Sequence, residues 1–184
     1  ARLASRAEPG ATARSRAEAV EAKGRLPARA EVVYIDFKVP AEAFMTIRFP
    51  SLEFFQALQQ RTKEDKAVFE KLGYCDTNFG VKIGSQLYTI GFEVYECVDV
   101  REGGDPTRLD FVIGGPTAVW GEMVKAILQH GGADAKHTLN TLSHVGDVLR
   151  IETTDAEGHD KFYRFMASIQ EFFDQARHLD VKVA

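Results

Sequence analysis

The sequence predicts an α+β domain, with a single sheet and with helices gathered on one face of it. Apolar and polar residues alternate in several short runs between residues 77 and 113, which is the period of strands with one buried face. Apolar residues recur at helical spacing in residues 51–72, 117–130 and 160–177. Because most of the strands follow one another along the chain, this order favours α+β over alternating βαβ units.

The composition indicates a globular domain with one hydrophobic core. The chain has 184 residues, of which 45% are hydrophobic and 27% are charged. No run approaches the roughly 18 consecutive apolar residues of a membrane-spanning helix, so no transmembrane segment is expected. The formal net charge of −4 argues against nucleic acid as a partner, because nucleic-acid-binding surfaces are usually strongly basic.

Residues 1–44 are expected to form an N-terminal arm or linker, and residues 45–184 the folded domain. Residues 1–30 hold seven Arg or Lys and three Glu, a net charge of +4, so the rest of the chain carries −8. This stretch has few large apolar side chains and cannot build a core of its own. Its composition is that of a mitochondrial transit peptide or of a linker in a cytoplasmic protein. The chain starts at Ala1, as expected after processing or trimming.

The first predicted elements are a short helix over residues 15–23 and a strand over residues 31–39. A longer helix follows Ser51, whose hydroxyl is a favourable N-cap. The inner face of this helix is expected to hold Leu52, Phe54, Phe55 and Leu58. A second helical segment over residues 63–72 ends at Gly73.

A β-meander is predicted after these helices. Its first strand is indicated by the alternating residues Phe79, Val81 and Ile83, and Gly84 with Ser85 forms the turn. The inward row of the next strand is expected to hold Tyr88, Ile90, Phe92 and Val94. A third run covers residues 97–100, and the glycine-rich residues 102–106 then turn the chain.

A strand, a turn and a helix are predicted over residues 107–130. Leu109, Phe111 and Ile113 set the buried face of the strand, which Gly114 and Gly115 are expected to break before the helix begins at Pro116. The helical stripe consists of Val119, Trp120, Met123, Val124, Ile127 and Leu128. Gly131 and Gly132 are expected to end this helix.

The remaining chain predicts a connector, a strand and a helix. Residues 130–144 are polar and contain glycine, so a connector with one short helical turn is expected. A last strand is predicted over residues 148–153 and a final helix over residues 160–177. The stripe of this helix is the strongest in the chain and consists of Phe162, Phe165, Met166, Ile169, Phe172, Phe173 and Ala176.

The sequence offers little for catalysis, and no enzyme activity and no cofactor are expected. It contains neither a G-x-S-x-G nucleophile elbow nor a G-x-x-x-x-G-K-[ST] phosphate loop. His130, His137 and His144 recur every seven residues, but Gly131 and Gly132 make one continuous helix through them implausible, so no metal site is expected. Cys75 and Cys97 make no metal-binding spacing and are interpreted as two buried thiols, with a disulfide left open.

The aromatic residues allow two interpretations. Thirteen Phe residues cluster on the helix after Ser51, the meander and the final helix. An ordinary core explains most of them, but several could instead line an apolar cavity between the helices and the sheet. Met123 and Met166 would then supply adaptable walls.

Five segments in this order resemble the sterol carrier protein 2-like domain family. They are FPSLEFFQAL, the β-meander, LDFVIGGPTAVWGEMV, VLRIETT and the Phe-rich final helix, and the most telling part is D-F-V-I-x-G-P-x-x-V-W-x-x-M from Asp110 to Met123. The resemblance covers about residues 45–177. It implies an antiparallel-rich, five-stranded sheet covered by helices, enclosing an apolar tunnel for a sterol, a fatty acid or a fatty acyl-CoA. It carries over no catalytic residue.

One departure from the family pattern lies between the second and third strands. The family usually turns there with a glycine, whereas this chain has Glu93, Val94, Tyr95 and Glu96. We expect a bulge or one long bent strand in place of a hairpin.

Two functions follow from these observations. The first is non-enzymatic binding of a lipid or fatty acyl ligand. The expected lipid-binding residues are Phe54, Phe55, Leu58, Phe92, Trp120, Met123, Val124, Ile127, Phe165, Met166, Ile169 and Phe173. The alternative is a structural subunit of a larger assembly, mitochondrial or cytoplasmic, in which the fold serves as a scaffold and residues 1–44 dock to other protein subunits.

Overall fold

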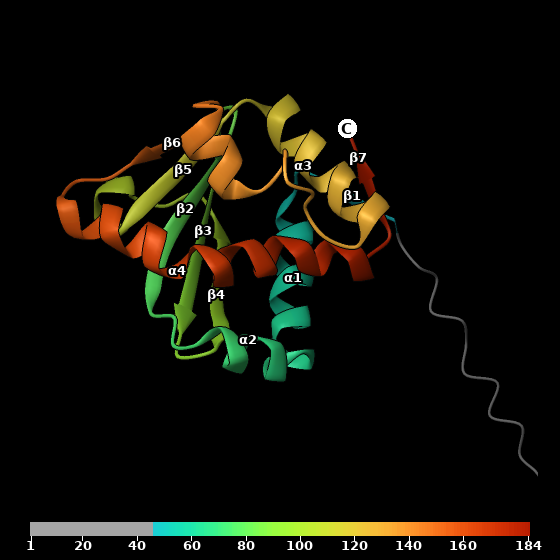
Figure 1. The fold of residues 1–184 in the computed structure, drawn as a ribbon, viewed down its shortest axis with the longest axis horizontal. Coiled ribbons are helices and arrows are strands. Elements are labelled where there is room, and N and C mark those ends of the chain that lie inside the picture. Colours follow the sequence, from blue (N-terminus) through green and yellow to red (C-terminus); the bar gives the residue numbers. More distant parts are fainter. Residues whose placement is uncertain (1–45) are drawn as a thin grey trace, which may run out of the picture. The chain divides into compact units, whose positions relative to one another are not determined.

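The computed structural model of the chain describes residues 46–184 (Figure 1). The predicted helix over residues 15–23, the predicted strand over residues 31–39 and the proposed arm over residues 1–44 therefore lie outside the described residues. No helix among the described residues is both long and apolar enough to cross a membrane.

The centre of the domain is a mixed five-stranded sheet with the strand order β4-β3-β2-β5-β6. The strands are β2 (Thr77–Ile83), β3 (Gln86–Glu93), β4 (Glu96–Glu102), β5 (Phe111–Gly115) and β6 (Arg150–Glu152). All neighbouring pairs are antiparallel except β2 and β5, which run parallel. The α+β class and the five-stranded, antiparallel-rich sheet are confirmed.

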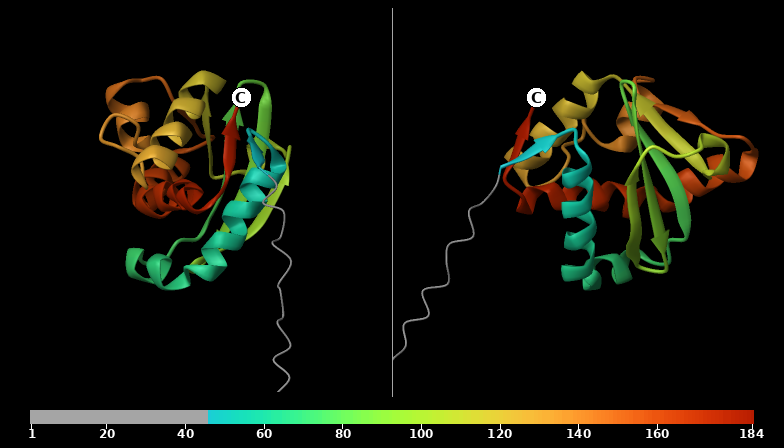
Figure 2. Two further views of the ribbon diagram at one scale, coloured as in Figure 1. Left: turned by 90° about the vertical axis from the view of Figure 1, so that its right-hand side faces the viewer. Right: turned by 180° about the vertical axis from the view of Figure 1, so that it is seen from behind.

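The helices lie where the apolar stripes predict them. They are α1 (Leu52–Glu64), α2 (Lys66–Leu72), α3 (Thr117–His130) and α4 (Ala156–Asp174). Ser51 caps α1 by accepting a hydrogen bond from the Phe54 N–H at 3.2 Å, and Gly131 ends α3 in the left-handed conformation. Figures 1 and 2 show α4 crossing the strands of the sheet on the side where α1 and α3 also lie.

Strand β5 runs through both glycines that were expected to break it, so that prediction is wrong. Gly114 pairs with Lys82 of β2 and with Arg150 of β6, and Gly115 pairs with Ile83. Pairing with β2 holds both glycines in extended backbone, and Gly114 is also paired with β6, although the local preference of glycine is for a turn. The missing side chain of Gly115 leaves room for Leu149, because a Cβ there would lie 2.3 Å from a Leu149 methyl carbon.

The expectation at residues 93–96 is also wrong, because β3 and β4 form a hairpin with a two-residue turn. Glu93 pairs with Glu96, and the ladder shifts register only further along, between Gly91 and Phe92. Two-residue hairpin turns need a positive φ, and Val94 adopts φ 59° although it is β-branched. Its carbonyl accepts a hydrogen bond of 2.7 Å from the Cys75 N–H, which holds the turn against the preceding loop.

Smaller differences concern the ends of the domain. Strand β6 covers only Arg150–Glu152, and α4 begins at Ala156 and gives way to a 3-10 turn, Gln175–His178. The chain then forms β7 (Val181–Val183), which pairs in parallel with β1 (Ile47–Phe49). Neither of these strands was predicted, because three residues carry too little periodicity to identify a strand.

The connector between α3 and β6 lies on α4 and is held there by side chains of that helix. The Ala133 N–H donates to Asp174 at 3.0 Å, and the Leu139 N–H donates to Gln170 at 2.7 Å. The expected short helical turn is present as a π-helical turn at Thr141–Val145. The connector thus covers one side of the helical layer.

The carboxylate of Asp110 joins three parts of the fold at the start of β5. It accepts hydrogen bonds from the Thr77 hydroxyl at 2.9 Å, the Asn78 N–H at 2.8 Å and the Lys161 ammonium at 2.8 Å. Burial by itself raises the pKa of Asp110, but the hydrogen bonds from Lys161, Asn78 and Thr77 outweigh it and hold the pKa below its usual value. Asp110 therefore ties β2 and α4 to β5 in its charged form.

We predict that Asp110→Asn lowers the free energy of unfolding at neutral pH by about 1.5–3 kcal/mol, because hydrogen bonds to a charged group are lost. The depressed pKa means that the Asp110 contribution is complete above about pH 4 and is lost as the pH falls through the folded-state pKa. The wild type should therefore lose stability in acid more steeply than Asp110→Asn. Urea unfolding between pH 2 and pH 7 measures both, with Asp160→Asn, an exposed partner of Arg164, as the control. Parallel pH curves for wild type and Asp110→Asn would contradict the prediction.

Candidate functional site

The twelve predicted lipid-binding side chains come together between the sheet and the helices. Eleven of them are buried in the core, and Met166 is half-buried and packs against it. They come from α1, β3, α3 and α4, which are far apart in the sequence. The structure therefore assembles these residues into one apolar interior.

Aromatic contacts connect this interior from one helix to the next. The Phe55 ring lies 6.2 Å from that of Phe173 between centroids, and Phe173 lies 5.3 Å from Trp120. Phe92 of β3 does not contact Phe173 in this way but lies 5.6 Å from its neighbour Phe172. Helices α1, α3 and α4 thus meet through aromatic rings.

The list of predicted lipid-binding residues leaves out two aromatic members of this interior. Tyr88 lies 4.5 Å from Phe55 between ring centroids, and Phe172 contacts both Phe92 and Phe173. Both residues belong to stripes that the sequence had indicated. Their positions in those stripes could have identified them as members of the interior.

The side chains of the interior pack directly against one another. Phe54, Phe55, Leu58, Trp120 and Met123 are each 0% exposed. None of the five pockets described for residues 46–184 is lined by any of the twelve predicted residues. A ligand in this interior would therefore have to displace packed side chains.

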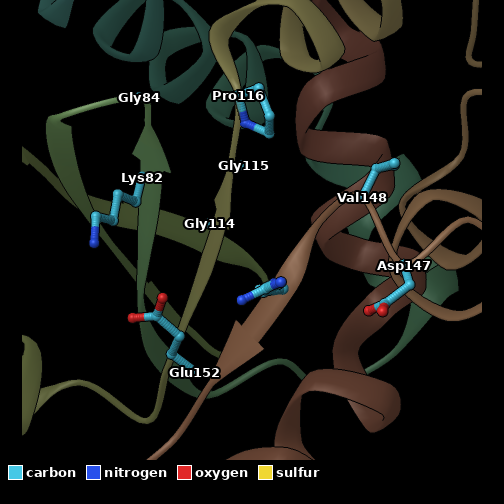
Figure 3. A pocket seen from close by; sticks show the side chains of 9 residues that line it. Lys82, Gly84, Gly114, Gly115, Pro116, Asp147, Val148 and Glu152 are labelled. Carbon is cyan, nitrogen blue, oxygen red and sulfur yellow. The ribbon is translucent and has the colours of Figure 1, made fainter.

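The largest of these pockets, about 470 Å³, opens where β2, β5 and β6 meet the start of α3 (Figure 3). Its lining consists of Lys82, Gly84, Gly114, Gly115, Pro116, Asp147, Val148, Arg150 and Glu152. Figure 3 shows the glycines of β5 between Lys82 on one side and Asp147 and Val148 on the other. Among the described residues, neither Lys82 nor Arg150 forms an ion pair, so both cationic groups are available to a ligand.

The sequence did not predict this pocket. Its two cations are 68 residues apart, and they come together only because β5 pairs with β2 on one side and with β6 on the other. No motif marks either residue. Because Gly114 has no side chain, the space above β5, between the side chains of the neighbouring strands, is left open and forms the bottom of the pocket.

The described part of the chain holds neither a metal-binding cluster nor an exposed thiol. No cluster of three or more His, Cys, Asp or Glu that could hold a metal ion occurs within residues 46–184. Cys75 and Cys97 are both free and buried, which confirms the interpretation as thiols. Burial, and then the nearby Asp76 charge, raise the pKa of Cys75 to about 12, so this thiol is a poor nucleophile at neutral pH.

Comparisons with known proteins identify the fold. No protein-family model matches the sequence, and no curated protein matches it. The crystal structure of sterol carrier protein 2 is similar, with a TM-score of 0.53 and 13% identity over 75% of this chain and 99% of that one. A solution structure from Thermus thermophilus, of a conserved hypothetical protein described as possibly a sterol carrier protein, has a TM-score of 0.52 and 14% identity over 72% of this chain and 90% of that one. The domain therefore has a sterol carrier protein 2-like fold.

Proposed function

We propose that this domain, which has a sterol carrier protein 2-like fold, binds a lipid in its apolar interior without catalysing a reaction. The observation that carries the proposal is the convergence of the twelve predicted side chains in one interior of that fold. The ligand would be a sterol, a fatty acid or a fatty acyl-CoA.

The energetics of such binding require apolar walls and few polar groups. Burying one CH₂ group yields about 0.8 kcal/mol, so a long acyl chain gains on the order of 10 kcal/mol before the costs of association. Because the interior is filled, part of this favourable free energy is offset by the cost of moving side chains out of the way. Met123 and Met166 suit that task, since methionine has three rotatable bonds and adapts to irregular spaces.

We further propose that the connector over residues 131–149 is the cover that moves aside when a lipid enters. It carries the π-helical turn Thr141–Val145, a conformation frequent at functional sites, and Leu149 at its end is fully buried. Displacing this segment would expose the interior beside α3 without breaking the central strands of the sheet. We therefore place the route of the lipid at this connector.

A second candidate is the structural subunit, in which the fold serves as a scaffold. The filled interior favours it, and so do exposed apolar side chains at the end of α2, after it and on the β3–β4 hairpin. They are Leu72, Tyr74, Val94 and Val98, which are 41%, 59%, 43% and 46% exposed. In this proposal residues 1–44 dock to neighbouring subunits, in mitochondria or in the cytoplasm.

One measurement separates the two candidates. We predict that the full chain, purified without detergent, is a small monodisperse species that carries about one lipid per chain, detected by organic extraction and mass spectrometry. A sample unfolded in guanidinium, stripped of lipid and refolded serves as the control and should take up added dodecanoate. Recovery in a large complex without lipid, and without uptake after refolding, would overturn lipid binding and support the scaffold.

A further inference from the structure

The apolar interior contains one polar group whose hydrogen bond is not made. The indole Nε1–H of Trp120 is buried and has no hydrogen-bond partner among residues 46–184, and the whole side chain is 0% exposed. Buried indole N–H groups usually find an acceptor, because an unpaired buried donor loses its bond to water without replacement. This donor lies on one of the predicted lipid-binding residues.

The indole N–H lies close to one residue that lines the largest pocket. Trp120 Nε1 lies 3.4 Å from the position that a Cβ on Gly115 would occupy, and the Val148 carbonyl oxygen is also 3.4 Å from that position. Gly115 and Val148 both line the pocket. The unpaired donor therefore lies beside Gly115, a residue that also lines the pocket.

A single side chain fills the space at this point. One methyl carbon of Leu149 lies 2.3 Å from the same Cβ position. Leu149 therefore occupies the space beside the indole that a side chain at Gly115 would otherwise fill. Leu149 is 0% exposed and belongs to the last residues of the connector that precedes β6. Movement of Leu149 would open a path from the pocket to the Trp120 N–H.

We propose that Trp120 selects lipids with an oxygen at their polar end, by donating its indole hydrogen bond to that oxygen while the chain lies in the interior. This inference rests on the proposed lipid binding and adds the position and chemistry of the polar end. A carboxylate is the strongest acceptor of this class. The charged residues Lys82 and Glu152 of the pocket lie near the missing side chain of Gly114, and successive residues of a strand point to opposite faces of the sheet. The Trp120 donor itself therefore supplies the selection.

The test uses the fact that Trp120 is the only tryptophan of the chain. In a ¹H–¹⁵N spectrum of the full chain it gives a single indole N–H signal. We expect saturating dodecanoate to move this signal to higher proton frequency. A matched variant, Trp120→Phe, keeps an aromatic ring but lacks the donor. We expect it to bind dodecanoate about tenfold more weakly, as measured by calorimetry.

A chain without oxygen separates loss of the hydrogen bond from loss of packing. Dodecane should raise the melting temperatures of the wild type and Trp120→Phe equally, whereas dodecanoate should raise that of the wild type more. The methyl ester of dodecanoate distinguishes a neutral carbonyl acceptor from a carboxylate. Dodecanoate binding that leaves the indole signal unmoved and is equally tight in Trp120→Phe would overturn the inference and leave lipid binding intact. No binding of dodecanoate to either protein would overturn both.

Discussion

Replacing Gly158 with alanine is expected to lower the free energy of unfolding by at least about 3 kcal/mol, or to prevent folding. A Cβ at this position would lie 1.8 Å from the carbonyl oxygen of Asp110 and 2.9 Å from its carbonyl carbon. Neither backbone can easily move away. The Gly158 N–H is bound to the capping Asp155 at 2.9 Å, and the Asp110 N–H is bound to the Asn78 carbonyl at 2.8 Å. Chemical denaturation of the purified variant measures the loss.

The matched control is Gly121→Ala, the same change in the interior of α3. Its Cβ would lie 3.2 Å from a methyl carbon of Val183, a side-chain contact that a shift of a few tenths of an ångström relieves. Alanine also gains up to about 1 kcal/mol of helix propensity over glycine, which offsets the crowding. Gly121→Ala should therefore be close to neutral. Equal losses in the two variants would show that α4 does not approach β5 as closely as the structure has it.

Truncating Phe173 to alanine is expected to cost about 3–5 kcal/mol, because a fully buried ring leaves a cavity that the packed interior fills only in part. Phe173 is 0% exposed and contacts Phe55, Trp120 and Phe172, so its loss weakens the packing of α1 and α3 on α4. Urea unfolding, together with near-ultraviolet circular dichroism of the neighbouring Trp120, measures the effect on stability and packing.

Tyr163→Ala on the same helix is the control for Phe173. Tyr163 is 42% exposed, and its removal should lower the free energy of unfolding clearly less than that of Phe173.

The two variants Phe173→Ala and Tyr163→Ala also test the proposed lipid-binding site. Because the cavity left by Phe173→Ala lies within the predicted lipid-binding set, dodecanoate should recover more stability in this variant than in Tyr163→Ala. A loss near 1 kcal/mol or less for Phe173→Ala would mean that the interior is loosely packed.

The composition of the interior was largely predictable from the sequence. The stripe of α4 identifies Phe165, Ile169 and Phe173 because side chains three and four residues apart share a helix face. Alternation in β3 likewise identifies Phe92. Whether such residues enclose a tunnel or fill it cannot be predicted in this way, because both arrangements require the same pattern of apolar residues.

The sequence by itself determined the fold class, the four helices and the apolar faces, because these depend on patterns and caps within a few residues of each other. The Ser51 cap and the Gly131 end are of this kind. The tertiary structure alone decided the passage of β5 through Gly114 and Gly115, the turn at Val94 and the parallel pairing of β1 with β7. It also decided the pocket beside Trp120. Each of these depends on contacts between segments distant in the chain, whose free energy outweighs the local preference of the residues involved.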